Sequence, residues 1–207
     1  MKDKIILAVK DAVCAVQQLE KDVSLEFIEK AAGLIADTFL DGKKIIIAGN
    51  GGSLCDAQHF AEELTGFFRK SRRPFPAIAL SDPGHITCVA NDLGFDWVFS
   101  RGVEAYGEVG DVFIGLTTSG NSENIINAFE AAKKIGLKTI AFLGKKGGRL
   151  KGFADLELDI ESFETSDRIQ EAHMTAIHII IEIVEVLINQ ESKTLNEKAC
   201  VNSLVFN

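Results

Sequence analysis

The chain has 207 residues, of which 46% are hydrophobic and 25% are charged, and its formal net charge at pH 7 is −8. A chain of this length and composition can bury a substantial core as one globular domain. The acidic balance argues against general nucleic-acid binding, which needs a basic face against the backbone phosphates, but a small anion can still be held by backbone amides and helix N-termini.

The N-terminal segment and the cysteines bear on location. The first twenty residues alternate charged and apolar side chains and lack the apolar stretch and cleavage site of a secretion signal. Charged or polar residues interrupt every apolar run before it reaches the roughly 18–20 residues that span a bilayer. The cysteines contain no CxxC pair; they are Cys14, Cys55, Cys88 and Cys200. We therefore expect reduced thiols, no membrane partner and a cytoplasmic location.

Helices and strands are predicted to alternate along the first half. Apolar residues near the N-terminus recur at three- and four-residue steps, at Ile5, Val9, Ala12, Val16 and Leu19. This spacing predicts an amphipathic helix. A second helix is predicted over residues 24–41, because Gly42 is a helix stop signal. A β-branched run at 43–49 predicts a strand, and a helix over 54–68 precedes a short strand at 76–80.

The second half repeats this alternation. Strands are predicted at residues 111–116, 137–144 and 154–160, and helices at 123–135 and 167–187. Short, continuously apolar strands that alternate with helices indicate a parallel sheet covered on both faces. The expected fold class is therefore α/β, a three-layer α/β/α sandwich with a parallel sheet and additional N-terminal helices. We expect one domain over residues 1–190 and a tail of unknown structure over 191–207.

Two polar turns follow predicted strands, where open parallel sheets bind their ligands. In the first, Asn50 to Ser53, the glycines Gly51 and Gly52 allow close backbone approach and Ser53 is expected to cap the next helix. The second turn carries four hydroxyls, at Thr117, Thr118, Ser119 and Ser122. Hydroxyls and amides together favour phosphate binding, although turn geometry and ordinary helix capping are the alternatives. Neither turn matches a P-loop or a GxGxxG motif, which disfavours nucleotide cofactors.

Histidine and glutamate residues suggest a metal or acid–base site. His59 stands four residues before Glu63, so both lie on one face of the same predicted helix. The alternative is an ordinary surface ion pair. Gln170, His173 and His178 lie on the last predicted helix, where apolar neighbours make His178 at least partly buried. Gln170 and His178 are about 12 Å apart along a helix, so the sequence leaves a shared metal site open.

Four segments occur in an order and at separations that are specific in combination: NGGSLCDAQHFAEELTG, ALSDPGHITCVANDLGFDWVFSRGVEAYGEVGDV, TTSGNSENIINAFEAAKKIG and DRIQEAHMTAIHI. Together they resemble the phosphoheptose (sedoheptulose 7-phosphate) isomerases of the SIS-domain class, over roughly residues 1–190. The resemblance implies a SIS-fold homotetramer, with active sites near subunit interfaces. It also implies conversion of sedoheptulose 7-phosphate to D-glycero-D-manno-heptose 7-phosphate, the first step of bacterial ADP- or GDP-heptose synthesis for lipopolysaccharide or capsule.

The resemblance also implies roles for individual residues and no redox cofactor. One zinc per site would be bound by His59, Glu63, Gln170 and His178. Glu63 and His178 would form the acid–base pair of an enediol mechanism, which removes a proton from C1 and delivers one at C2. The implied substrate contacts are Asn50, Gly51, Gly52, Ser53, Glu63, Asn91, Asp92, Thr117, Thr118, Ser119, Ser122 and Gln170.

One position departs from the family pattern, and two other functions are considered. Phe67 stands where the family usually has an arginine, and Arg69, Arg72 or Arg73 is a candidate substitute. Bacterial proteins that bind the replication initiator resemble this fold and need no catalysis, but they commonly lack a histidine at the position of His178. A regulatory SIS module that senses a sugar phosphate would need only the hydroxyl turn.

Overall fold

The computed structural model describes the backbone of residues 1–204 and the side chains of residues 1–191. Within these residues, parallel strands form one sheet in the order β2-β1-β3-β4-β5. The strands are β1 (Ile45–Gly49), β2 (Ala77–Ala79), β3 (Val112–Thr117), β4 (Lys138–Gly144) and β5 (Leu156–Ile160). The predicted parallel sheet is confirmed.

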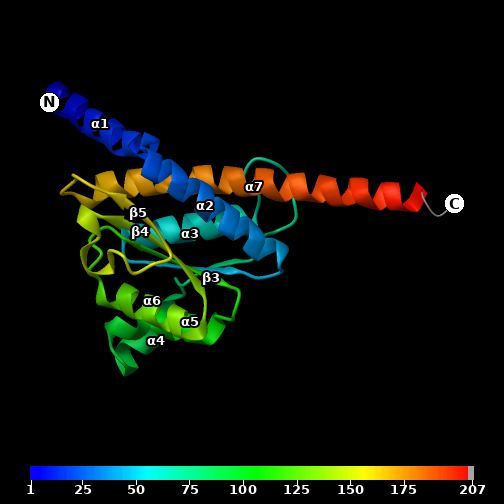
Figure 1. Ribbon diagram of the computed structural model, residues 1–207. Helices are drawn as coiled ribbons and strands as arrows, with labels where there is room; N and C mark the ends of the chain where they lie inside the picture. Colours follow the sequence, from blue (N-terminus) through cyan, green and yellow to red (C-terminus); the bar gives the residue numbers. More distant parts are fainter. Residues whose placement is uncertain (205–207) are drawn as a thin grey trace.

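Helices cover both faces of the sheet and make three layers (Figure 1). One face carries α1 (Lys2–Gln17), α2 (Asp22–Leu40), α3 (Gly52–Thr65) and α7 (Ser166–Leu204). The other face carries α4 (Pro83–Asp92), α5 (Val98–Tyr106) and α6 (Glu123–Ile135). The α/β/α sandwich and the additional N-terminal helices agree with the sequence prediction.

The central strand β1 shows why the sequence forms this sheet. Ile45 and Ile47 are buried against the helices of the first face, whereas Ile46 and Ala48 are buried against those of the second. Successive side chains of a strand point to opposite faces, so a strand covered on both faces needs continuous apolar sequence. The run IIIA meets this requirement.

The predicted end of the last helix is wrong, and two helices were not predicted. The last helix continues well beyond residue 187, to Leu204, so the predicted domain end at residue 190 falls inside α7. Of the predicted tail, residues 205–207 lie outside the described residues. No element was predicted over residues 81–107, where the chain forms α4, a short 3-10 helix and α5. None of the helices within residues 1–204 is long and apolar enough to span a membrane.

Candidate active site

The two polar turns lie side by side at the carboxyl edge of the sheet. β1 and β3 are neighbours, and β2 pairs with the opposite side of β1. After β1 the chain crosses to β2 on one side, and after β3 it crosses to β4 on the other side. The connections therefore diverge between β1 and β3, which opens a crevice between the turns that follow these two strands. The sequence predicted the turns, and the strand order brings them together.

A pocket of about 130 Å³ lies between these turns and the start of α7. Its lining is mostly hydroxyl and amide groups: Asn50, Ser53, Leu116, Thr117, Thr118, Ser119, Ser122, Ser166 and Gln170. Thr117 Oγ1 lies 3.5 Å from Ser119 Oγ and 3.4 Å from Ser122 Oγ, and it accepts the Gly120 N–H at 3.2 Å. Such a cluster of small polar groups suits an anion with several oxygen acceptors.

Helix capping does not account for these hydroxyls. Ser122 occupies the N-cap position of α6, but its hydroxyl makes no capping hydrogen bond and lies instead near Thr117. The predicted cap at Ser53 is wrong, because Gly51 is the N-cap of α3 and takes a φ of 55°. Left-handed φ values favour glycine, so this turn starts the helix without a side-chain cap and places Ser53 in the pocket.

Close contacts hold the two turns in place. Asn50 and Asn124 exchange amide hydrogen bonds of 2.8 and 2.9 Å, which join the first turn to the start of α6. Behind the second turn, a Cβ on Gly148 would lie 2.3 Å from the carbonyl oxygen of Ser119, and a Cβ on Gly120 would lie 1.8 Å from that of Gly147. The segment that follows β4 therefore supports the hydroxyl turn from behind.

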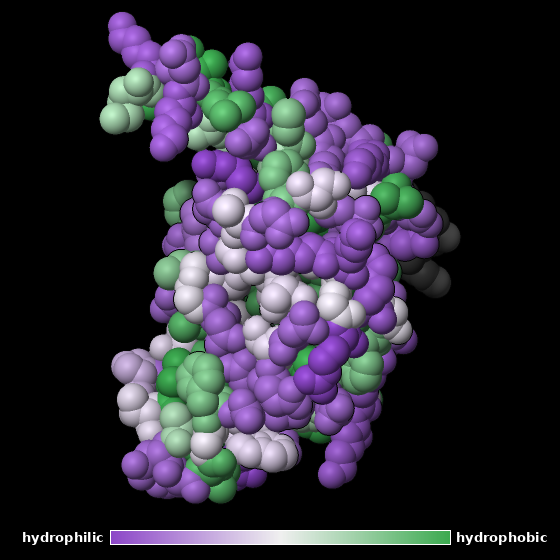
Figure 2. Space-filling view, turned by 90° about the vertical axis from the view of Figure 1, so that its left-hand side faces the viewer, coloured by the Kyte–Doolittle hydropathy of each residue, from purple (hydrophilic) through white to green (hydrophobic). Residues whose placement is uncertain are grey.

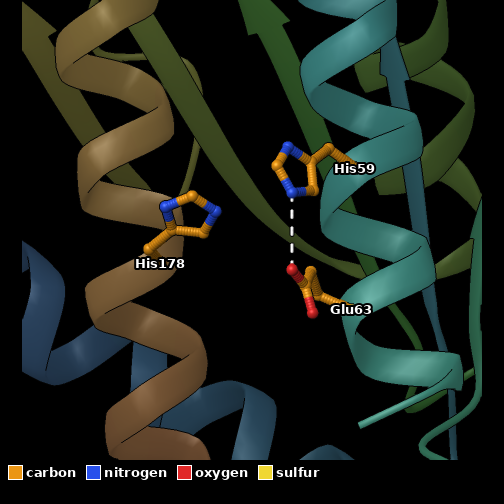
Figure 3. Close-up of side chains that lie close together, drawn as sticks. All are labelled: His59, Glu63 and His178. Atoms are coloured by element: carbon orange, nitrogen blue, oxygen red, sulfur yellow. Dashed lines mark ion pairs between the residues drawn. The ribbon is translucent and has the colours of Figure 1, made fainter. Parts of the chain in front are cut away.

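His59, Glu63 and His178 form a second polar cluster, and each offers one ligand atom within 4.8 Å of the others. His59 Nε2 lies 3.4 Å from Glu63 Oε1, and the rings of His59 and His178 are 5.1 Å apart. Figure 3 shows His178 on α7 facing His59 and Glu63 on α3. Two imidazoles and a carboxylate match the nitrogen and oxygen ligands of zinc, so these residues fit a divalent metal.

Burial alters the electrostatics of this region. Burial, followed by the nearby charge of His59, lowers the pKa of His178 below its usual value. One turn before His59, Asp56 has a buried Oδ2 with no hydrogen-bond partner among the described residues, and burial raises the pKa of this carboxyl to about 6. Both effects favour neutral forms and are typical of functional sites.

The remaining predicted residues lie in different places. Gln170 sits in the hydroxyl pocket, where it packs over Gly52 and donates to Ser53 Oγ at 3.3 Å. Asn91 and Asp92 are exposed at the end of α4, outside the pocket lining, and the Asn91 amide donates to the Asp92 carboxylate at 2.8 Å. Their contact with substrate stays a prediction.

Phe67 is 61% exposed in the loop after α3, and the candidate arginines are engaged elsewhere. Arg69 pairs with Glu182, Arg72 pairs with Glu185, and Arg73 donates to the carbonyl of Phe39. In this structure none of these arginines lines the hydroxyl pocket.

Three site residues escaped the sequence analysis. Ser166 lines the pocket, with its hydroxyl 3.0 Å from that of Thr118, and its position just before the last predicted helix was an available capping signal. Phe68 stacks on His178 with ring centroids 5.5 Å apart. Phe68 and Asp56 carried no local signal, because their roles depend on contacts between helices.

Comparisons with known proteins agree with this arrangement. Residues 10–144 match the model of the SIS domain family. The phosphoheptose isomerase of Fusobacterium nucleatum is 59% identical over 167 residues, which cover 81% of this chain and 86% of the relative. That of Vibrio cholerae is 57% identical, with 81% and 87% covered. The solved phosphoheptose isomerase of Neisseria gonorrhoeae superposes with a TM-score of 0.83 at 36% identity and covers 89% of this chain and 98% of its own.

Proposed function

The chain belongs to the SIS domain family and, within it, to the phosphoheptose isomerases, and we propose that it converts sedoheptulose 7-phosphate to D-glycero-D-manno-heptose 7-phosphate. In bacteria this is the first step toward ADP- or GDP-heptose for lipopolysaccharide or capsule. The observation that carries the proposal is that α3 and α7 connect the hydroxyl pocket to the cluster of His59, Glu63 and His178.

The spacing along these two helices supports a long sugar phosphate as the substrate. Ser53 and His59 are about 9 Å apart along α3, and Gln170 and His178 are about 12 Å apart along α7, at 1.5 Å per residue. These lengths are comparable with that of an extended seven-carbon sugar phosphate. We place the phosphate in the hydroxyl pocket and C1 and C2 beside the histidines and Glu63.

At the phosphate end, the pocket would bind and orient the substrate. The implied contacts are Asn50, Ser53, Thr117, Thr118, Ser119, Ser122 and Gln170, which all line the pocket. The backbone at Gly51 and Gly52 and the side chains of Asn91 and Asp92 complete the proposed contact set. Fixing the phosphate raises the effective concentration of C1 and C2 at the acid–base groups.

At the other end, Glu63 would remove the proton from C1 of the ketose and His178 would act as the acid. The lowered pKa of His178 leaves a neutral imidazole at neutral pH, in which one nitrogen can bind a metal while the other carries an N–H toward the substrate. That nitrogen can give its proton to the C2 oxygen and take one from the C1 oxygen, while Glu63 delivers at C2 the proton that it removed from C1, so that the enediol forms and collapses without net gain or loss of protons.

We propose that the metal is zinc, one per site, held by His59, Glu63 and His178 with Gln170 as a further ligand. When bound, zinc supplies positive charge that stabilises negative charge on the substrate oxygens. Gln170 lies in the pocket at the Ser53 end of α3, so its amide would have to serve both the pocket and the metal.

We also propose a cytoplasmic homotetramer with active sites near subunit interfaces. A groove of about 580 Å³ between α1 and α7 includes His178 in its lining. Exposed apolar side chains gather on α1, at Ile5, Ile6, Leu7, Val9 and Val13. Figure 2 shows α1 projecting from the body at the top of the view, with green atoms among the purple ones. A second subunit that covered these side chains would also enclose the site.

The deciding experiment measures turnover of sedoheptulose 7-phosphate by the purified protein with zinc supplied, followed by NMR. The wild type should convert the substrate, and His178→Asn should lose most of the conversion. His85→Asn is the matched control, because His85 lies on α4 and contacts the carbonyl of Val98. No conversion by the wild type would contradict the proposed substrate and would favour initiator binding or another sugar phosphate.

A further inference from the structure

The loop between α3 and β2 contacts both helices that carry the histidine cluster. Figure 1 shows this loop, residues 66–76, in teal beside α7. Its Phe68 ring stacks on the imidazole of His178, with centroids 5.5 Å apart and an angle of 23° between the planes. The same imidazole also contacts the ring of His59, with centroids 5.1 Å apart and an angle of 78° between the planes. His178 therefore contacts both a loop residue and an α3 residue.

A buried ion pair fixes the loop to α7. Arg72 Nε donates to Glu185 Oε1 at 2.6 Å, and the two side chains are only 8% and 7% exposed. The same carboxylate oxygen accepts the backbone N–H of Phe68 at 3.3 Å. Glu185 lies two turns after His178 on the same face of α7. One carboxylate thus sets the position of Phe68 relative to His178.

Arg72 also holds the carboxyl end of α3. Its Nη2 donates to the carbonyl of Glu63 at 2.9 Å, and its Nη1 donates to those of Leu64 and Gly66 at 2.9 and 3.2 Å. The last carbonyls of a helix lack partners within the helix, so the guanidinium caps α3. Glu63 therefore belongs to the histidine cluster through its carboxylate and to the cap through its carbonyl.

The guanidinium of Arg72 also packs on buried aromatic rings. The Cζ atom of Arg72 lies 4.0 Å from the ring centre of Phe75, which stacks on Phe39 at 5.0 Å. Both phenylalanines are almost fully buried. A planar guanidinium that is paired, bonded to three helix-end carbonyls and stacked on a buried ring has little freedom to move.

We propose that Phe68, Glu185 and Arg72 form a clamp that positions His178 on α7 against His59 and Glu63 on α3. Phe68 orients the ring of His178, and the Arg72–Glu185 pair sets the separation of the two helices. The clamp residues are positioning residues, since none belongs to the proposed ligand or substrate set. This inference rests on the proposed function for its effect on turnover, but its effect on ring geometry stands without it.

Phe68→Leu tests the orienting role, with Phe153→Leu as the matched control. Phe153 is also partly buried but packs on Phe129, on the opposite face of the sheet. Loss of a residue that orients a metal ligand typically costs roughly 10–100-fold in metal affinity or activity. We expect Phe68→Leu to lower zinc affinity, measured by chelator competition, and kcat by about tenfold with KM unchanged. Values equal to those of Phe153→Leu would overturn the proposal.

A second readout needs neither turnover nor metal. Among four histidines, the imidazole NMR signals of His178 are those that disappear in His178→Asn. Stacking on Phe68 should shift these signals upfield in the chelator-treated wild type, and Phe68→Leu should abolish the shift. Unchanged His178 signals would refute the clamp. If the signals respond but the wild type does not isomerise the heptose phosphate, the proposed function fails and the clamp remains.

Glu185→Gln tests the link from the ion pair to the ring. Glutamine keeps the size of the side chain and an acceptor for the Phe68 N–H but removes the charge that holds Arg72. We expect the His178 signals to move in Glu185→Gln, and the double variant with Phe68→Leu to lose no more kcat than Phe68→Leu alone, because residues of one network act non-additively. Additive losses of kcat would mean that the Arg72–Glu185 pair and the Phe68 ring act independently, which would overturn the clamp. If Glu185→Gln does not fold, Arg72→Lys tests the same link, because lysine keeps the charge but loses the planar fork that bonds Glu185 and the α3 carbonyls.

Discussion

His59 and Glu63 lie one turn apart on α3, with His59 Nε2 3.4 Å from Glu63 Oε1, and the neighbouring Glu62 comes within 3.8 Å of the same nitrogen. The two glutamates differ in burial, since the Glu63 side chain is 22% exposed and that of Glu62 is 68% exposed. Only Glu63 joins His178 in the ligand cluster. The helix therefore presents two similar carboxylates to His59 and directs one of them into the site.

This pair allows a matched test of the proposed base. Glu63→Gln keeps the shape of the side chain but removes its ability to accept a proton, so we expect turnover to fall by about 10²–10⁴-fold with the fold retained. Glu62→Gln makes the same chemical change on the solvent side and should leave turnover near that of the wild type. Undiminished turnover in Glu63→Gln, or an equal loss in both variants, would remove Glu63 from the mechanism.

The parallel sheet was predictable because buried strands need continuous apolar residues, which the run IIIAG shows plainly. The helices α4 and α5 were missed. Pro83 and Gly84 suggest a loop, yet Pro83 is at the start of α4 and the Asp82 carboxylate accepts the His85 N–H at 2.7 Å. An Asp cap followed by Pro is a helix start signal, so α4 could have been predicted from the sequence.

The site was predictable only in parts. Helical spacing paired His59 with Glu63, but nothing in the spacing brings His178 beside them, because that contact depends on how α7 packs against α3. The resemblance to the family supplied this link. The contact between Phe68 and His178 could not be predicted for the same reason, because stacking between residues of two different elements leaves no periodic signal in the sequence.

The metal proposal is tested by comparing a histidine inside the cluster with one outside it. His59→Asn removes one of two imidazoles in a three-residue ligand cluster, so metal content measured on chelator-free protein should fall from about one per chain to near zero. His85→Asn, on α4, should keep the wild-type content. A wild-type protein that is metal-free and fully active would contradict the zinc proposal, as would His59→Asn with its metal content intact.

Two glycines test the support behind the hydroxyl turn. Gly148 and Gly152 have φ values of 53° and 76°, so an alanine at either position costs roughly 1–3 kcal/mol of backbone strain. Only at Gly148 does the added Cβ meet the turn, 2.3 Å from the carbonyl oxygen of Ser119, whereas Gly152 has open space. Gly148→Ala should therefore raise KM for the sugar phosphate, and Gly152→Ala should only lower stability. Equal KM values would show that the turn is independent of this contact.

The buried His173 predicts how stability depends on pH. Its Nε2 lies 2.8 Å from the carbonyl oxygen of Leu143, its Nδ1 is buried without a partner among the described residues, and burial lowers the pKa of His173 to about 4. The ordinary pKa of histidine is about 6.5, so between pH 6.5 and 4 the unfolded chain takes up a proton that the folded chain does not. Stability should fall as the pH drops through this window, by about 3 kcal/mol at most, and should not depend on this residue above it.

His173→Gln isolates this contribution, because glutamine offers an N–H near Leu143 but does not titrate. Urea unfolding at several pH values between 4.5 and 7.5 measures the free energy of unfolding of both proteins. The wild type should be more stable than the variant at pH 7.5, and its advantage should shrink toward pH 4.5. An advantage that stays constant with pH would mean that His173 is protonated as readily in the folded chain as in the unfolded one, and that the burial of its ring does not govern its charge.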